Sequence, residues 1–507
     1  MAGTKGATSG TRHLDAHDTE GQSSVAVVGT GLAGLTTAYL LNNDAEKRYK
    51  VTLFEQSQLL SFAGASVAVK NAKEDMIEQI DLPMRASAGG YYDNLMRMYH
   101  FVGIPLHPIR FLFTFAKATT SNASPKTIPL TPQTAGEATG AYFVHASNLH
   151  QLLPPRPESR SLIAYLFEIA YLIICHFWFS VACFVVAPRT GAAAPGGECE
   201  DLREYLKRIW LPRRYITHYL LPLMSAVSTC SHAEILRFPA SDIVNYKRHS
   251  TGQQHYAVCG GADQVQRKLS EGIHDVRLAT RVLSVQPVDG KVVLRFQTDD
   301  GEATEQAFDR LVLAVSPDVA GRLYSPVESL LQEIPTVYAE SSVLTHDVST
   351  HSVIGYGGQG EGALSCAHHS STGNMPAQVL TFRTLFTGDD SKTEAMHAMP
   401  SGVVVSTCPF ASECGKGTLH SAGFIRTLRS KHSRSVVQAI MREAQPENGG
   451  KEDEETMTWV NGQDNVWLAG AWCWDGMVLL EGCVVSAMRV AQDFGVAIPW
   501  QGITVPY

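Results

Sequence analysis

Short apolar runs stand next to glycine-rich turns near both ends of the chain, and this pattern predicts buried parallel strands followed by helices. Residues 25–28 are apolar and mostly β-branched, as in a buried parallel strand. A helix is predicted from about Leu32 to Leu41 and a second strand at residues 50–55. Together they form a βαβ unit of about thirty residues. Near the C-terminus, a strand at residues 466–470 precedes a helix that starts near Glu481.

The middle of the chain carries a mixed pattern of helices and strands. Helices are predicted at residues 92–102 and 201–230, and a loop at residues 117–140, which are rich in Thr, Ser, Ala and Pro. The Asp289-Gly290 turn indicates a hairpin between residues 276 and 297. The remaining predictions are a buried strand at residues 311–315, alternating strands and loops at 335–410, and a charged, mobile segment at 443–455.

The turn after the first strand contains G-x-G-x-x-G at residues 29–34, in the right context for a dinucleotide site. Gly29 permits the tight turn, Gly31 lets the backbone approach a pyrophosphate, and Gly34 lets the helix pack closely on the sheet. The helix N-terminus offers unpaired N–H groups to the phosphates. Glu55 can accept hydrogen bonds from the ribose hydroxyls and would repel a 2′-phosphate. The predicted cofactor-binding residues here are Gly29, Gly31, Leu32, Ala33, Gly34 and Glu55.

FAD and NAD share this motif, and the C-terminal segment distinguishes them. Gly470-Ala471-Trp472 closes the last predicted strand, and Glu481-Gly482 opens the last helix. A second glycine-flanked helix N-terminus suits the N1–C2=O edge of a flavin, which gains negative charge on reduction. The sequence therefore predicts FAD as the cofactor, with Gly470, Trp472 and Glu481 among its binding residues.

These segments resemble the flavin-containing amine oxidase superfamily, and within it the fungal and bacterial amine-oxidase-like branch associated with lipid and polyene chemistry. Asp81-Leu82-Pro83-Met84-Arg85 and the glycine pair at 260–261 add to the resemblance. The resemblance implies an α/β fold in which a Rossmann-like FAD-binding domain (GR2-type amine oxidase fold) is interleaved with a mixed α+β substrate domain. It also implies that Arg85 approaches the isoalloxazine and that the backbone amide of Val282 contacts the adenine.

The chain departs from the superfamily in the stretch that follows Glu55. Residues 58–65 replace the usual Gly-Gly-Arg-like turn, and no lysine is matched to the active-site lysine of amine oxidases. The expected domain order is a disordered leader at 1–23, FAD-binding parts at 24–80, 256–320 and 456–507, and substrate-domain parts at 81–255 and 321–440.

Residues 162–187 form the most apolar stretch, which is long enough to cross a bilayer, since about 20 residues suffice. One crossing would place the two halves of the flavin site on opposite sides of the membrane. The stretch is therefore expected to lie in one leaflet, to form a helical hairpin, or to pack against the substrate domain. A basic cluster with Trp210 follows it, suited to lipid headgroups: Arg203, Lys207, Arg208, Arg213 and Arg214.

Composition narrows the class of protein further. Apolar residues make up 44% of the 507 residues, as in a folded chain, and the net charge of -8 argues against nucleic acid as a partner. Ten dispersed cysteines, with neither a CxxC pair nor metal-like spacing, are typical of a reduced intracellular protein without a metal. The polar N-terminus lacks a secretory signal. The protein is thus expected to be intracellular, not secreted, and attached to a membrane through 162–187.

The expected activity is hydride transfer from a small hydrophobic substrate (a lipid, polyene or amine) to flavin N5, with O₂ as the candidate electron acceptor. One alternative is a fatty-acid or polyene double-bond isomerase, and another is a non-catalytic flavin-binding protein at a membrane. Catalytic residues are not identified; Thr345-His346-Asp347 is the one acid–base constellation. The aromatic residues expected to line the cavity are Tyr91, Tyr92, Trp472 and Trp474.

Overall fold

The computed structural model describes residues 21–73, 75–119, 128–146, 155–191, 199–299, 301–357, 377–410, 417–441 and 459–505. Most of the leader predicted for residues 1–23 lies outside these ranges, and so does the charged segment predicted for 443–455.

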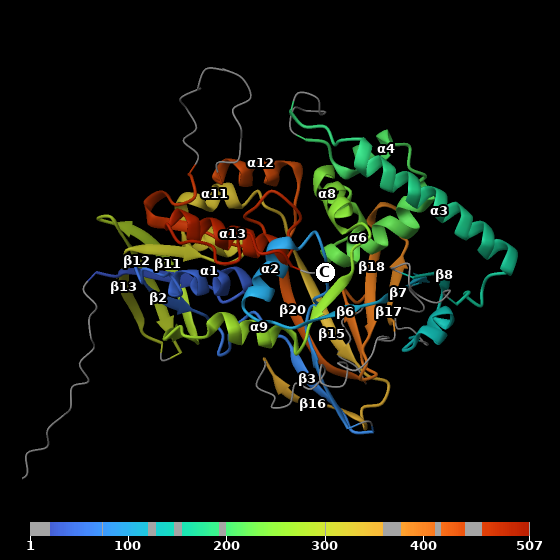
Figure 1. Cartoon of the computed structure of the whole chain (residues 1–507), viewed down its shortest axis with the longest axis horizontal. Helices are drawn as coiled ribbons and strands as arrows, with labels where there is room; N and C mark the ends of the chain where they lie inside the picture. The colour runs from blue at the N-terminus through green and yellow to red at the C-terminus, as the bar shows by residue number, and fades with distance from the viewer. Residues whose placement is uncertain are drawn as a thin grey trace, which may run out of the picture.

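Five parallel strands form the first sheet, in the order β10-β2-β1-β14-β21. Its strands are β1 (Ser23–Val28), β2 (Tyr49–Phe54), β10 (Asp275–Arg277), β14 (Arg310–Leu313) and β21 (Val466–Leu468). Figure 1 shows α1 (Leu32–Asn42) and α13 (Leu480–Asp493) next to one another beside this sheet. Because all strands run the same way, the carboxyl ends of β1 and β21 meet at one edge. The predicted Rossmann-like domain is confirmed.

Seven strands form a second, mixed sheet in the order β20-β15-β19-β18-β17-β7-β8. Only β7 and β17 pair in parallel within it. Its strands are β7 (Phe111–Ala118), β8 (Ala141–Ala146), β15 (Thr336–Leu344), β17 (Gln378–Leu385), β18 (Lys392–Ala398), β19 (Val404–Thr407) and β20 (Thr418–Thr427). In Figure 1 this sheet lies to the right of the parallel sheet. The two sheets alternate along the chain, so the interleaved α/β fold class is confirmed, while the domain boundaries stay predictions.

Three small sheets complete the strands. The hairpin predicted around Asp289-Gly290 is present, and both residues have positive φ (49° and 76°). Its sheet contains β11 (Thr280–Val288), β12 (Lys291–Thr298) and β13 (Ala303–Phe308). The other two contain β16 (His351–Tyr356), β3 (Val67–Asn71) and β4 (Met76–Ile80), and β5 (Ser87–Ala88), β9 (His255–Val258) and β6 (Leu106–Ile109).

The remaining helices cover the two large sheets. They are α2 (Asp93–Phe101), α3 (Leu162–Val185), α4 (Leu202–Arg208), α5 (Arg213–Tyr215), α6 (Leu221–Ser228), α7 (His232–Ile235), α8 (Ala240–Ser250), α9 (Gly261–Ser270), α10 (Pro317–Leu323), α11 (Glu328–Leu331) and α12 (Lys431–Ile440). The helix predicted for 201–230 is interrupted, because Trp210 has a positive φ of 57° and Pro212 follows it. The loop predicted for 117–140 also needs correction, since it includes the end of β7 and a 3-10 helix at Pro132–Glu137.

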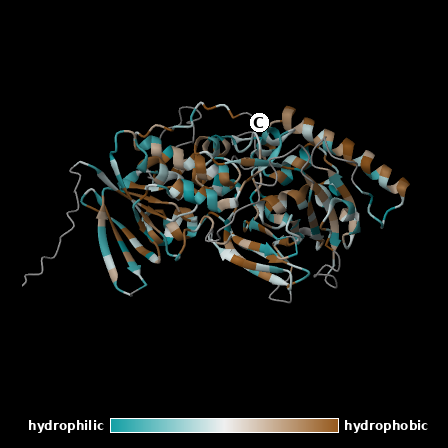
Figure 2. Ribbon diagram, turned by 60° about the horizontal axis from the view of Figure 1, so that its bottom comes forward, coloured by the Kyte–Doolittle hydropathy of each residue, from teal (hydrophilic) through white to brown (hydrophobic). Residues whose placement is uncertain are grey.

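The apolar stretch forms one continuous helix, α3, at the outer edge of the molecule, where Figure 2 shows it largely in brown. It is the one described helix that is long and apolar enough to cross a membrane, and 22% of its most apolar 18 residues are buried. A helical hairpin is therefore wrong, because the helix has no break. The helix does pack on the rest of the protein along one stripe of buried side chains, but most of its side chains face outward.

Seven of the described cysteines are free, and Cys259 is disulfide-bonded. The expectation that the cysteines are reduced is therefore wrong for Cys259. Pairing depends on which cysteines approach in space, which their spacing in the sequence does not reveal. The intracellular location stays a prediction.

Candidate functional site

The three glycines after β1 have three different environments. Gly29 has a φ of +98°, and a Cβ there would lie 2.6 Å from the carbonyl oxygen of Ala314. A Cβ on Gly34 would lie 2.0 Å from the carbonyl oxygen of Gly29, so the helix packs on the turn without room for a side chain. A Cβ on Gly31 would meet no atom within 4 Å. Gly31 is the N-cap of α1, and no N-cap side chain bonds to the first N–H groups of that helix.

Glu55 lies directly after β2 and is buried. Its carboxylate accepts hydrogen bonds from Thr30 N (3.3 Å), Thr30 Oγ1 (2.5 Å) and Ser57 N (3.0 Å). The backbone N–H of Thr280 donates to the carbonyl oxygen of Glu55 (2.8 Å), which places Val282 two residues further along β11. The structure therefore brings the glycine turn, the acidic residue and Val282 to one edge of the parallel sheet.

The C-terminal segment that begins at Gly470 lies at the same edge of the parallel sheet. Ser486 Oγ on α13 is 3.0 Å from the backbone nitrogen of Gly470 and 3.1 Å from its carbonyl oxygen. Burial raises the pKa of the Cys483 thiol to about 11, against hydrogen bonds from the backbone N–H groups of Ala33 and Ala471 that lower it. Cys483 thus joins the first turn of α1 to the start of α13, although they are far apart in the sequence.

Glu481 and Trp472 use their side chains to hold neighbouring elements. The Glu481 carboxylate accepts from Asn94 N (2.9 Å), Asn94 Nδ2 (2.8 Å) and Leu95 N (3.0 Å) at the start of α2. A carboxylate at a helix N-terminus is stabilised by the helix dipole. The indole N–H of Trp472 donates to the carbonyl oxygen of Val315 (3.1 Å). Contact of these two residues with a cofactor stays a prediction.

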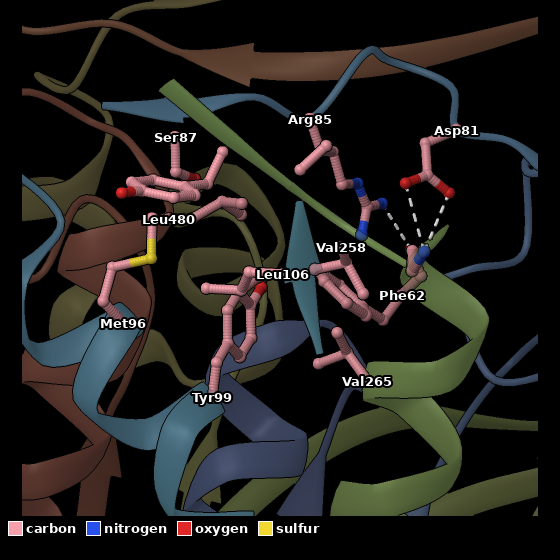
Figure 3. A pocket seen from close by; sticks show the side chains of 13 residues that line it. Phe62, Asp81, Arg85, Ser87, Met96, Tyr99, Leu106, Val258, Val265 and Leu480 are labelled. Carbon is pink, nitrogen blue, oxygen red and sulfur yellow. Dashed lines mark hydrogen bonds between the residues drawn. The ribbon is translucent and has the colours of Figure 1, made fainter. Parts of the chain in front are cut away.

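A narrow pocket lies between α2 and α9, and Figure 3 shows Arg85, Phe62 and Tyr99 around it. The guanidinium of Arg85 lies 3.9 Å from the centre of the Phe62 ring and donates to the Phe62 carbonyl through Nη2. Its Nη1 is buried and makes no hydrogen bond. Burial lowers the pKa of Arg85, and negative charge on Asp81, Tyr99 or Cys483 would oppose that effect. A buried N–H group of this kind suits an anionic or carbonyl oxygen.

The first residue of the Asp-x-Pro-x-Arg segment, Asp81, has a structural role. Asp81 accepts from the backbone N–H of Ala262 at 2.9 and 3.1 Å, at the N-terminus of α9, and from Ser66 Oγ at 2.9 Å. The open volume of the pocket is about 10 Å³, which is room for about one water molecule. A larger ligand in this pocket would therefore displace lining side chains.

Three of the four aromatic residues predicted to line the cavity come together. The Tyr91 ring lies 5.4 Å from Tyr92, 4.8 Å from Tyr246 and 6.2 Å from Trp474, measured between ring centroids. Trp474 also stands over Gly482, where a Cβ would lie 2.4 Å from its indole nitrogen. Trp472 is not part of this contact group and points to β14.

Sequence reasoning missed four residues of this neighbourhood. They are Tyr99, Arg426, Arg429 and Cys483. The sequence could have predicted that Tyr99 faces the same way as Tyr92, because Tyr92, Met96 and Tyr99 repeat at the spacing of one helix face. No sequence pattern indicates the role of Arg429, because its partners lie far along the chain. Its Nη2 donates to three carbonyl oxygens of the C-terminal loop, on Trp472 (3.1 Å), Trp474 (2.7 Å) and Gly476 (3.2 Å).

Asp347, the carboxylate of the possible acid–base group Thr345-His346-Asp347, already has partners at the surface. The Asp347 carboxylate pairs with Lys73 (3.0 Å) and accepts from Ser349, and these hydrogen bonds hold its pKa below the usual range. Within the part of the chain that the structure describes, no group of three or more His, Cys, Asp or Glu side chains could hold a metal ion.

Two family models match the chain. The model of the NAD(P)-binding Rossmann-like domain matches residues 27–102, and that of the flavin containing amine oxidoreductase matches residues 236–353. No curated protein matches.

Solved structures with the same fold cover almost the whole chain. An oxidoreductase from Methanosarcina mazei is 12% identical, covering 92% of this chain and 100% of its own, with a TM-score of 0.51. A CLA-producing fatty acid isomerase from P. acnes is 11% identical (93% and 99% covered, TM-score 0.53). Cyclohexylamine oxidase from Brevibacterium oxydans is 12% identical (94% and 100% covered, TM-score 0.51).

Proposed function

Because the chain belongs to the flavin-containing amine oxidoreductase family, a family of enzymes, we propose that it is an FAD-dependent oxidoreductase acting on a hydrophobic substrate. One observation carries this proposal. Helices α1 and α13 pack against one another, and each follows a strand of the same parallel sheet, so the glycine turn at Gly29 to Gly34 and the start of α13 lie at one edge of that sheet. Two helix N-termini at one place supply N–H groups both for a pyrophosphate and for the electron-rich edge of a flavin.

The residues present fit FAD. The open space at Gly31 and the uncapped start of α1 suit the pyrophosphate, and Glu55 suits the ribose of an adenosine without a 2′-phosphate. Val282 lies beside Glu55, in position for the adenine, and α13 begins where the flavin ring is expected. When bound, the flavin would supply an acceptor for two electrons at N5.

The chain's own residues would bind and orient the substrate. Apart from Asp81, Arg85, Ser87 and the Tyr hydroxyls, the pocket lining is apolar, so a substrate that displaces the lining side chains and enters the pocket would have to be hydrophobic. The buried Nη1 of Arg85 would donate a hydrogen bond to an oxygen of the substrate or of the flavin. Burial raises the pKa of Tyr99, so its hydroxyl keeps the proton at neutral pH.

A second candidate is a double-bond isomerase acting on a fatty acid. A guanidinium with an unpartnered N–H in an apolar pocket suits a carboxylate at the end of an apolar chain, and this observation supports the candidate. In an isomerase the hydride returns to the substrate, so turnover consumes no electron acceptor. Use of O₂ as acceptor and the nature of the substrate (lipid, polyene or amine) stay predictions.

The test is spectroscopic. We expect the purified protein to be yellow and its flavin absorbance to bleach when a fatty acid, polyene or amine is added without oxygen. A product with a shifted double bond, formed without consumption of oxygen, would identify the isomerase. A colourless protein that does not bind added FAD would overturn both candidates. A yellow protein that turns over none of these substrates would favour the non-catalytic flavin-binding alternative.

A further inference from the structure

The helix α3 presents its apolar side chains to solvent instead of to the core. Five of them are between 68% and 73% exposed: Ile163, Phe167, Ile174, Phe177 and Val185. The side chains that α3 buries form a narrow stripe on the opposite side: Tyr165, Glu168, Cys175, Phe179, Ala182 and Cys183. A helix on the surface of a soluble protein has the reverse pattern, and a large exposed apolar patch marks an interaction site.

Contacts along its whole length hold α3 to the protein. Near its start, the Tyr165 hydroxyl donates to the carbonyl oxygen of Val144 (3.3 Å). In the first half, Glu168 forms an ion pair with Arg214 (2.7 Å) and accepts from the Tyr219 hydroxyl. Near the end, the Tyr205 hydroxyl on α4 donates to the carbonyl oxygen of Ala182 (3.0 Å). Both halves of α3 thus pack on one body, so the helix cannot cross a bilayer without breaking these contacts.

Cationic and aromatic residues stand beside the apolar face. Trp178 on α3 donates to the carbonyl oxygen of Ile209 (2.7 Å), and the next residue, Trp210, is 88% exposed. Figure 1 shows α4, which leads to Trp210, next to α3. The exposed cations of this segment that make no ion pair among the described residues are Arg203, Lys207 and Arg213.

Two members of the basic cluster expected from the sequence have a different role. Arg208 forms an ion pair with buried Glu200 (2.6 Å), and Arg214 forms the pair with Glu168. These two arginines hold α4 and α5 in place, which leaves the three exposed cations to interact with a partner.

We propose that this surface, made by the outer face of α3 with Trp210, Arg203, Lys207 and Arg213, binds the interface of a bilayer that contains anionic lipids. The helix lies in the headgroup region of one leaflet and does not span the membrane. Tryptophan and cations are the residues that favour this depth. A second copy of the chain would bring equivalent cations towards one another, whereas anionic headgroups neutralise them. The proposal does not depend on the flavin.

The first experiment is flotation of the full chain with vesicles. We expect weak binding to phosphatidylcholine vesicles and stronger binding when phosphatidylserine is included, reversed in part by salt. Replacing Arg203, Lys207 and Arg213 by Gln should weaken binding to the anionic vesicles about fivefold for each charge removed. The matched control replaces three exposed cations elsewhere, Lys50, Arg295 and Lys392, by Gln and should bind as the parent does.

The apolar face is tested by a second variant. Phe167→Gln, Ile174→Gln and Phe177→Gln together should weaken binding to both kinds of vesicle by at least about a hundredfold. The control variant carries Val288→Gln, Val348→Gln and Ile425→Gln, which are exposed apolar residues on other elements. Equal binding by the two variants would overturn the proposal.

A third measurement needs no change on α3. Vesicles of brominated lipid should quench tryptophan fluorescence of the parent protein, and less so that of a Trp210→Phe variant. Absence of quenching would overturn the proposal. So would light scattering that shows a dimer which the apolar-face variant converts to a monomer, because a second copy would then cover this face.

Discussion

At the scale of single residues, two glycines of the turn after β1 lack a side chain for different reasons, although they look the same in the sequence. Gly34 is needed by the protein itself, because a Cβ there would lie 2.0 Å from a backbone oxygen. Gly31 is not, because a Cβ there meets no atom, and its backbone has an ordinary φ of -66°. The space in front of Gly31 is therefore open to the pyrophosphate that we propose binds there.

We predict opposite results for two substitutions. Gly34→Val should destabilise the folded chain by about 3 kcal/mol or more, because neither the turn nor α1 can move far enough. Gly31→Val should cost less than about 1 kcal/mol, since valine is a poorer N-cap than glycine, yet should abolish flavin binding. Thermal denaturation and flavin absorbance measure the two effects. Retained flavin in Gly31→Val would contradict the placement of the pyrophosphate.

The buried histidine His397 gives a prediction about pH. Burial lowers its pKa to about 4, and its Nε2 bonds with Gln378 Oε1 (2.7 Å). The unfolded chain takes up the proton near pH 6.5, before the folded chain does. Stability from this group is therefore fully present above pH 6.5 and is lost as the pH falls towards 4, by at most about 3 kcal/mol.

Urea denaturation between pH 7 and 4 measures this effect. His397→Gln should show a shallower loss of stability over that range than the parent protein. His432, whose side chain is 56% exposed, provides the control, and His432→Gln should follow the parent curve. Parallel curves for His397→Gln and the parent would show that the buried imidazole does not titrate as proposed.

At the scale of elements, the sequence predicts those whose signal is local. The strands β1 and β14 contain contiguous apolar runs, β2 is mostly buried, and glycines that the turn chemistry requires mark the start of α1. The strands β5 and β9 were missed, because they are short and pair with one another although they lie far apart along the chain. The same reason explains the missed part of the site. Arg429 and Cys483 act through contacts that no local pattern encodes.

The C-terminal loop that leads into α13 is held by the chain segment after β20. Arg429 is buried, and its donors reach three carbonyl oxygens of the loop. The neighbouring Arg434 forms an ion pair with Asp475 in the same loop (2.6 Å). A loop without regular structure beside the proposed flavin site is thus fixed by side chains from the segment that runs from the end of β20 into α12.

We predict that Arg429→Met weakens FAD binding at least tenfold and lowers stability by about 3 kcal/mol, because the carbonyl oxygens lose charge-assisted donors in a buried place. Titration of the flavin-free protein with FAD gives the affinity. Arg295→Gln, an exposed arginine on β12, should change neither value. A variant that is less stable but binds FAD normally would separate this loop from the flavin site.

At the scale of the whole molecule, the proposed flavin site joins parts that are far apart in the chain. The glycine turn follows β1, Val282 lies on β11, and Cys483 belongs to the last helix. The parallel sheet itself takes β14 from the middle of the chain and β21 from its end. No continuous third of the sequence contains the complete site.

This arrangement makes a prediction about unfolding with and without the cofactor. A ligand that contacts only the folded state adds stability of about 2.7 kcal/mol at a free concentration of 100 times its Kd. Because the site takes residues from the beginning, middle and end of the chain, FAD should stabilise all of these segments together. Calorimetry should therefore show the transition of the parallel sheet moving as one peak to higher temperature when FAD is added. If FAD shifted only part of that transition, the N-terminal and C-terminal segments would not share the cofactor, and a flavin site shared between α1 and α13 would have to be abandoned.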